Sequence, residues 1–315
     1  MGVWLVGADV LARSRFRTSA LAETVAALLV LLGAPARPGR QDVARHRPAL
    51  RERLAADPVT AAFARAAVTP GWLADVLCVP PADDDLDIGD ELARVRRTPA
   101  DAVLAGLAPG RSRPAELAVP DLGDRVADLL GWVWELAVAP DWPRLARAFE
   151  ADIVARTRRL TTGGWAAALG DLRHGTRWLG DGRLQINAHD HPPRDLAGAQ
   201  LLFIPAVTAN GWAGWAPPHR YSLVYPCGGL LAAGPAAAPG TLSRLLGPGR
   251  AAVLAALGTP MSTTQLVAVT GHGLGSVGNH LKVLLDAGLV RRRRAGRSVL
   301  YYRTGTAERL LRAQR

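Results

Sequence analysis

The spacing of apolar residues predicts a long helical region in the first half of the chain. Apolar positions recur every three or four residues, which is the period of an amphipathic helix. Four segments show this period most clearly: 21–32, 43–54, 122–138 and 145–160. The acidic run at 83–91 has the composition of an exposed loop that leads into a helix, because Asp favours helix starts. We therefore predict mainly helical structure up to about Arg177.

The pattern changes after residue 183. Three short runs rich in β-branched and aromatic residues follow, RLQINA, LLFIPAVTA and RYSLVYP, separated by Gly and Pro clusters. Such runs predict a small sheet or a set of hairpins. The next stretch, GGLLAAGPAAAPG, has the composition of a linker. We therefore divide the chain into an N-terminal domain at 1–232, a linker at 233–240 and a C-terminal domain at 241–315.

Helical spacing returns after the linker, with clear start and stop signals. The predicted helices cover 248–257, 263–270 and 276–287. Ser262 and Gln265 form an S-x-x-Q capping box, in which each side chain satisfies a free backbone amide at the start of the second helix. Gly271 and Gly288 stand where the second and third helices should end.

A β-hairpin is predicted after the third helix. Its first strand starts at Val290, Ala295 and Gly296 form a two-residue turn, and the return strand covers 298–303. A helix, a helix-turn-helix and a hairpin in this order form a winged helix. The predicted fold class is thus α+β, mainly α with a small amount of β: a helical N-terminal domain with a short β region, followed by a C-terminal winged helix-turn-helix.

Three glycines offer a competing interpretation of the same region. Gly273, Gly275 and Gly278 have the G-x-G-x-x-G spacing of a dinucleotide-binding loop. Such a loop needs a strand before it and an acid about 20 residues after it. The capping box predicts a helix instead of the strand, and the expected acid position falls in the basic run VRRRRAGR. A nucleotide- or small-molecule-binding protein or enzyme that uses this motif is the alternative to the winged helix.

The net charge of the chain is concentrated in the C-terminal domain. Residues 241–315 contain 12 Lys and Arg against 2 acids, a net charge of +10. The remaining 240 residues contain 26 basic residues (38 − 12) against 25 acids (27 − 2), a net charge of +1. A near-neutral body joined to a basic module is typical of a nucleic-acid-binding protein.

The winged-helix pattern predicts which side chains meet DNA. On the third helix, an apolar stripe packs inward and leaves polar side chains on the opposite face, where base edges are read. In the hairpin, the cations nearest the turn are placed for phosphate or minor-groove contacts. The predicted DNA-binding residues are Ser276, Asn279, His280, Lys282, Arg293, Arg294 and Arg297, together with Thr263 and Thr264 at the start of the second helix.

Candidate chemistry elsewhere in the chain is sparse. Core packing is the ordinary explanation for the nine tryptophans, and an aromatic ligand pocket that includes Trp132, Trp134 and Trp178 is the alternative. The two cysteines lie 149 positions apart, no Cys/His cluster has metal-ligand spacing, and no catalytic motif is present. We expect no enzyme activity, no cofactor and no bound metal. With no signal peptide and no apolar run of spanning length, we expect a cytoplasmic protein without membrane contact.

Several phrases resemble known families. STTQLV, SVGNHLKVLLDAGLV and RRRRAGRSVLYYRT are similar to the ArsR-type winged helix-turn-helix of bacterial regulators, over about 75 of the 315 residues. LARSRFRTSALAETVAAL and LVYPCGG resemble the DUF5937 domain found next to this module in actinobacterial regulators.

The ArsR-type resemblance implies a homodimeric repressor that binds a double-stranded operator. Such modules pair through helices that flank the reading unit, here the segment 241–257 and the final helix 307–312. Metal sensors of this family carry a Cys-rich motif before the turn, whereas residues 262–271 contain no Cys. We therefore expect a small organic effector, bound by the N-terminal domain.

Overall fold

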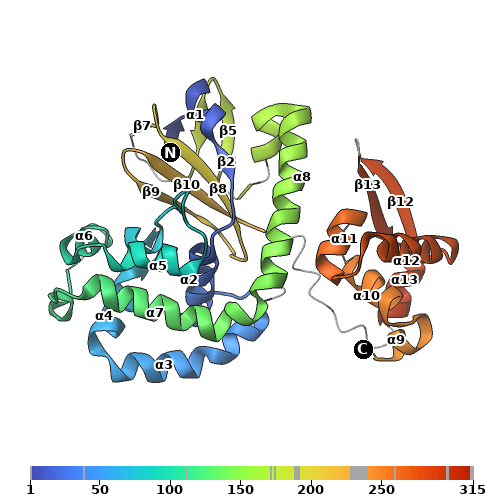
Figure 1. Ribbon diagram of the computed structural model, residues 1–315, viewed down its shortest axis with the longest axis horizontal. Helices are drawn as coiled ribbons and strands as arrows, with labels where there is room; N and C mark the ends of the chain where they lie inside the picture. The colour runs from blue at the N-terminus through green and yellow to red at the C-terminus, as the bar shows by residue number, and fades with distance from the viewer. Residues whose placement is uncertain are drawn as a thin grey trace. The chain divides into compact units, whose positions relative to one another are not determined.

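A computed structural model describes residues 2–37, 40–110, 112–170, 172–173, 175–187, 192–227, 240–258, 260–295 and 298–312. Two compact units are present. The first comprises Met1–Ala36, Arg40–Trp142 and Ile153–Pro226, and the second comprises Cys227–Arg315 with Arg37–Gly39 and Pro143–Asp152. The predicted linker at 233–240 lies outside the described residues except for its last position. Helices and small sheets occur in both units, which confirms the predicted α+β class (Figure 1).

The predicted helices of the first unit are present. Residues 21–32 and 122–138 correspond to α2 (Ala20–Leu31) and α7 (Leu122–Ala137). Residues 145–160 lie within α8 (Trp142–Leu169), which kinks at Gly164 and whose first part, Pro143–Asp152, is grouped with the second unit. Residues 43–54 divide between a 3₁₀ helix η1 (Gln41–His46) and α3 (Arg47–Ala56). The other helices of this unit are α1 (Ala8–Arg13), α4 (Pro58–Ala67), α5 (Ile88–Arg96), α6 (Ala100–Ala105) and the 3₁₀ turns η2 (Asp75–Leu77), η3 (Ala115–Leu117) and η4 (Ala139–Asp141).

Helix α2 is buried on nearly all sides and is held by two carboxylates. Glu91 of α5 accepts hydrogen bonds from Ser19 Oγ at 2.6 Å and from the Leu21 amide at 2.7 Å, both at the start of α2. Glu23 is fully buried and lies 3.2 Å from the Arg40 guanidinium. A buried carboxylate is costly unless it is paired, so these contacts fix α2 in the helical layer.

The prediction of helix from the start of the chain was wrong for several short segments. Two four-stranded sheets have the orders β5-β6-β1-β7 and β2-β8-β10-β9, so each contains one strand from the first 16 residues. Their strands are β1 (Val3–Leu5), β5 (Arg177–Gly180), β6 (Arg183–Gln185) and β7 (Arg194–Asp195), then β2 (Arg15–Phe16), β8 (Gln200–Ala206), β9 (Trp212–Ala216) and β10 (Arg220–Pro226). A further hairpin joins β3 (Val68–Thr69) to β4 (Trp72–Leu73).

The strands before residue 177 were not predicted, because two or three residues cannot show an alternating pattern. Pairing with distant partners stabilises them: β1 lies antiparallel to β6 and parallel to β7, and β2 lies parallel to β8. Both sheets contribute to one apolar core, which includes Trp4, Leu184, Phe203 and Leu223. Figure 1 shows the two four-stranded sheets grouped on one side and helices α2 to α7 packed together on the other.

The second unit contains the predicted winged helix. Its elements are α9 (Gly240–Leu246), α10 (Pro248–Ala256), β11 (Met261–Ser262), α11 (Thr263–Thr270), α12 (Leu274–Asp286), β12 (Val290–Ala295), β13 (Ser298–Arg303) and α13 (Gly305–Arg312). The three strands have the order β11-β13-β12. Several boundaries differ from prediction by one or two residues. Helix α12 starts two residues earlier than expected, and Ala295 pairs with Ser298, so Ala295 belongs to the strand and not to the turn.

Candidate nucleic-acid interface

A tight turn joins the two helices that define the interface. The Ser262 amide donates to Gln265 Oε1 at 2.8 Å and the Gln265 amide donates to Ser262 Oγ at 3.3 Å, so the predicted capping box starts α11. Gly271 ends α11 in the left-handed conformation, with φ 69°. Helix α12 starts at residue 274, so three residues separate the two helices, as in a helix-turn-helix.

Helix α12 has one buried face and one exposed polar face. Val277, Leu281 and Leu284 are each at most 1% exposed and pack into the core of the unit. The predicted contact residues Ser276, Asn279 and Lys282 are all exposed. The helix therefore presents hydrogen-bond donors and acceptors, and one cation, along a single solvent-facing side.

His280 has a different environment from the other predicted contact residues. Its half-buried ring lies 3.1 Å from Ser276 Oγ through Nε2, and its centroid lies 5.7 Å from that of His272. A Cβ on Gly249 would come within 2.4 Å of Nε2, so the ring packs closely on the start of α10. Burial lowers the pKa of His280, and the charges of His272 and Arg250 lower it further. In this position, a neutral His280 orients the Ser276 hydroxyl.

The three glycines of the G-x-G-x-x-G spacing lie at the start of α12. Gly273 is the N-cap, and Gly275 and Gly278 belong to the helix itself. The element before them is helix α11, whereas a dinucleotide loop requires a strand. A Cβ added at any of the three would meet no atom within 4 Å. Packing within the described protein therefore does not require glycine here, and the backbone at the helix start is uncovered.

Leu274, at the first position of α12, was missed by the sequence analysis. It is 63% exposed, although it is a large apolar residue next to the glycines. It lies three positions before Val277 and seven before Leu281, so helical spacing places it on the apolar stripe, and nothing in the sequence indicated that this first turn would be exposed. An exposed apolar side chain at the start of a reading helix is suited to contact with a thymine methyl group.

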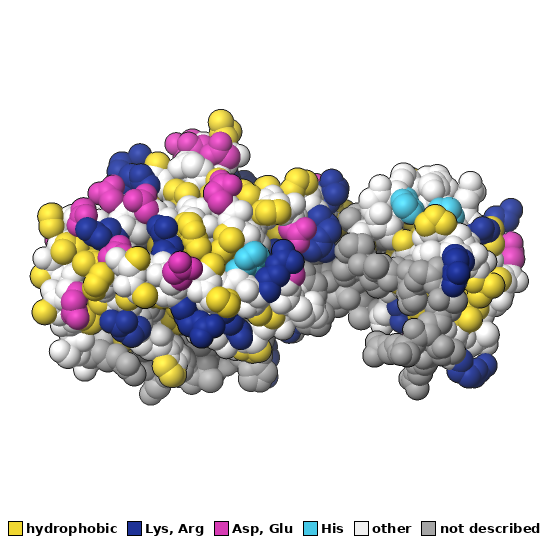
Figure 2. All heavy atoms as spheres, turned by 90° about the horizontal axis from the view of Figure 1, so that it is seen from below, with side chains coloured by type: hydrophobic (Ala, Val, Ile, Leu, Met, Phe, Trp, Pro, Cys, Tyr) yellow, Lys and Arg dark blue, Asp and Glu magenta, His cyan; other side chains and the backbone are white. Residues whose placement is uncertain are grey.

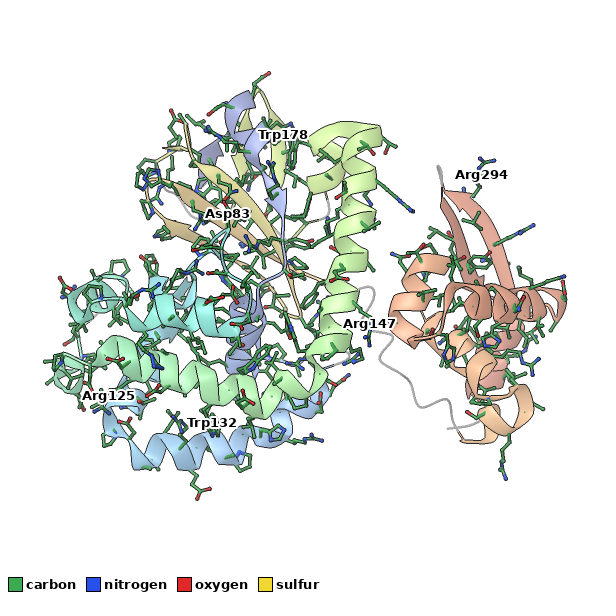
Figure 3. The ribbon with its side chains drawn as sticks, viewed as in Figure 1. Asp83, Arg125, Trp132, Arg147, Trp178 and Arg294 are labelled. Carbon is green, nitrogen blue, oxygen red and sulfur yellow. The ribbon has the colours of Figure 1, made fainter. Side chains whose placement is uncertain are left out.

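The hairpin carries a row of cations without carboxylate partners. Arg291 to Arg294 are all exposed, and none of them forms an ion pair within the described part of the chain. Arg294 projects from the end of the hairpin (Figure 3). Arg297 lies outside the described residues. At the start of α11, Thr264 is exposed and Thr263 is half-buried.

Arg303 belongs to the same hairpin, but its side chain is bound within the unit and stabilises the fold. Its Nε donates to the Leu254 carbonyl oxygen at 2.8 Å, and another of its nitrogens donates to the Ala255 carbonyl oxygen. Its guanidinium also lies 3.3 Å from Glu308. Arg303 thus caps the end of α10 and is not available for DNA. On the face seen in Figure 2, acidic and basic side chains are intermingled over the larger unit, while basic ones predominate on the winged helix.

Comparison with known proteins decides the class of this unit. Residues 245–293 match the sequence model of a family described as a helix-turn-helix domain. The second unit contains a helix-turn-helix domain. The match covers α10 to most of β12 and indicates a DNA-binding regulator. No curated protein and no solved structure matches the chain. No described helix combines the length and the apolar character needed to cross a membrane.

The three tryptophans predicted for a ligand pocket do not come together. Trp132 of α7 lies beneath the Arg53 guanidinium, 5.2 Å from ring centroid to Cζ. Trp134 packs edge-on against Trp142, with centroids 5.3 Å apart. Trp178 packs on the apolar core of the two sheets. Figure 3 shows Trp132 among the helices and Trp178 among the strands of the first unit.

Proposed function

We propose that the protein is a transcriptional regulator, most simply a repressor, that binds operator DNA through α12 and the β12-β13 hairpin. The observation that carries the proposal is the combination of an exposed polar face on α12 with the exposed row Arg291 to Arg294, which has no carboxylate partner among the described residues. The exposed polar face alone could belong to any solvent-facing helix, and the row of unpaired cations beside it is what distinguishes this one. Together they form the two DNA-contacting parts of a winged helix.

The two parts have different roles in this proposal. Asn279 and Ser276 read base edges in the major groove, since an Asn side chain can bond adenine through two hydrogen bonds. Lys282, Arg293, Arg294 and Arg297 contact phosphates, which add affinity without sequence preference. Thr263, Thr264 and His280 complete the predicted set, His280 by orienting Ser276 at 3.1 Å.

The glycine-bordered start of α12 supports the same proposal. Backbone amides at a helix N-terminus have no partners inside the helix and favour an anion such as phosphate. Without side chains at Gly273, Gly275 and Gly278, the backbone can approach DNA closely. This role accounts for glycines that the nucleotide-binding alternative would assign to a cofactor.

We propose a homodimer on an inverted repeat, because one winged helix covers only a half-site. Half-site centres would lie about 10 base pairs apart or a multiple of that distance. The ArsR-type resemblance points to α9, α10 and α13 as pairing helices. Leu245 of α9 is 64% exposed, and Leu310 and Leu311 of α13 are half-buried. Light scattering that shows only monomers, with one chain per DNA duplex, would rule this assembly out.

The first unit is proposed to bind a small organic effector and to have no catalytic role. Its size far exceeds what a DNA clamp needs, and the DUF5937 resemblance places such a domain beside regulatory winged helices. An effector shifts DNA binding only if it binds the DNA-free and DNA-bound states with different affinities.

A gel-shift experiment beside a thermal-shift experiment separates this proposal from nucleotide binding. The full chain is tested on DNA from upstream of its own gene and on a random duplex of equal length. The same preparation is heated with NAD, NADP and ATP. Retention of the upstream DNA without stabilisation by any nucleotide supports the regulator. Stabilisation by a nucleotide without DNA retention supports the alternative.

A further inference from the structure

The first unit contains a large cavity between its helices and strands. Its volume is about 1230 Å³, enough for a drug-sized molecule. Four tryptophans line it: Trp4 of β1, Trp72 of β4, and Trp212 and Trp215 of β9. Val30 of α2 and several prolines add further apolar wall. None of the tryptophans singled out from the sequence lines this cavity, because the strands that supply its walls are short and were only partly predicted.

Arg173 also lines the cavity, and its charge has no partner among the described residues. Its Nε and Nη1 atoms are buried and make no hydrogen bond, and no carboxylate in the described part of the chain pairs with it. Burial lowers the pKa of Arg173, and no neighbouring acid offsets that effect. A guanidinium with two buried and unpartnered nitrogens is costly to the fold. A bound ligand with a negative group would therefore supply the missing partner of Arg173.

The other charged groups at the cavity are already engaged. The Arg194 guanidinium stacks over the Trp215 ring, 5.1 Å from its centroid. Asp195 accepts a hydrogen bond from the Ala197 amide at 2.9 Å. Among the residues that the structure describes, two cations and one acid line the cavity, a formal net charge of +1. Arg173 is the cation left to meet a ligand.

We propose that this cavity binds an organic anion with a flat aromatic body, whose negative group pairs with Arg173. The tryptophan walls suit an aromatic body, because flat rings stack or meet edge to face. A small inorganic anion would leave these walls uncovered, and a neutral aromatic molecule would leave the guanidinium unpaired. The inference rests on the proposed function only in taking this ligand as the effector, since the binding itself requires no DNA.

Two dyes with the same aromatic body test the proposal. 1-Anilinonaphthalene-8-sulfonate carries one negative group, and N-phenyl-1-naphthylamine is its neutral parent. Both become fluorescent in apolar surroundings. We expect the full chain to bind one sulfonate dye per chain. Its dissociation constant should be about tenfold or more lower than that of the neutral dye, because a hydrogen bond between charged groups raises affinity by at least this factor. Sodium sulfate at the same concentration should not displace the dye.

Arg173→Met should abolish the preference for the anionic dye and keep the affinity for the neutral one. Arg177→Met is the matched control, because Arg177 is exposed on β5 and does not line the cavity. Arg173→Met should unfold at no lower a temperature than the parent, since it removes an unpaired buried charge. Should it fail to fold, Arg173→Gln makes the same comparison with a polar side chain.

Each outcome bears on the inference. An equal preference in the parent and in Arg173→Met would overturn it, and so would the binding of neither dye. If the preference depends on Arg173 but the chain does not bind DNA, the cavity assignment stands and the proposed regulator fails. If DNA binds and the preference is absent, only the cavity assignment fails.

Discussion

Several arginines of the first unit have surroundings opposite to those of the hairpin arginines in the second. In the first unit, Arg94 lies 2.6 Å from Asp85 and Arg125 lies 3.1 Å from Asp57, while Arg40 is buried against Glu23. In the hairpin of the second unit, Arg291 to Arg294 stand exposed without carboxylate partners among the described residues. Arginine therefore stabilises the fold in the first unit, whereas in the hairpin it is available to bind a polyanion.

The number of nearby acids explains the difference. Residues 1–240 contain nearly as many acids as bases, so carboxylates are available to pair with their cations. Residues 241–315 contain only Asp286 and Glu308, and Glu308 already pairs with Arg303. The ratio of acids to bases within each unit, more than the number of arginines, indicates which unit can bind DNA.

The largest expected effect comes from breaking a buried pair in the first unit. Arg40→Ala leaves Glu23 without its cation in a fully buried position. We expect a loss of about 3–5 kcal/mol in the free energy of unfolding. Calorimetry of the full chain measures it, with the exposed Arg51→Ala as the control. A loss no greater than that of the control would show that this pair does not support the fold.

A smaller effect is expected from the reading face of α12. Asn279→Ala should reduce the discrimination between upstream DNA and a random duplex by about 1–3 kcal/mol. Asp286→Ala, near the other end of the same helix, removes an acid and should tighten binding to both duplexes alike. Fluorescence anisotropy gives both ratios. Unchanged discrimination in Asn279→Ala would remove Asn279 from the reading face.

Gly278→Ala should have two opposite effects. Because a Cβ at this position meets no atom within 4 Å, the change should stabilise α12 by about 1 kcal/mol. The same Cβ should hinder the approach of DNA and weaken binding. Gly131→Ala in α7 is the control and should change stability without affecting DNA binding. Tighter DNA binding by Gly278→Ala would contradict a close approach of the backbone.

The smallest expected effect is the pH dependence contributed by His280. Its pKa is lowered from 6.5 in the folded chain by burial and by the charges of His272 and Arg250. The unfolded chain therefore binds the proton more tightly. Stability from this group is fully present above pH 6.5 and is lost as the pH falls toward the lowered pKa.

Thermal unfolding of the full chain at a series of pH values checks this contribution. His280→Gln should flatten the acid side of the stability profile. A profile that is identical in the parent and in His280→Gln would show that the ring does not titrate with folding.

The sequence predicted the winged helix well because its signals are local. The capping box at Ser262 and Gln265, and the glycines at 271 and 288, fix helix ends through neighbouring residues. The two sheets of the first unit depend instead on pairing between distant segments, such as β1 with β6. Strands of two or three residues have no period of their own, so pattern analysis could not find them.

The candidate sites divide in the same way. The exposure of Ser276, Asn279 and Lys282 follows from helical spacing and was predicted. The contact of His280 with the start of α10 depends on Gly249, which is 31 positions away, and was not foreseen. The cavity of the first unit combines α2, both sheets and Arg173, so no single stretch of sequence could reveal it.

The salt dependence of DNA binding tests the difference between the two units most directly. Anisotropy titrations with upstream DNA are run at several salt concentrations for the parent chain, for Arg293→Ala with Arg294→Ala, and for Arg51→Ala with Arg65→Ala. Arg51 and Arg65 are exposed residues of the first unit, so both double variants remove two surface cations. The hairpin variant should reduce the log–log slope by about 0.9 for each lost phosphate contact, and the first-unit variant should leave it unchanged. Equal slopes in the two double variants would contradict the assignment of DNA binding to the unpaired cations of the hairpin.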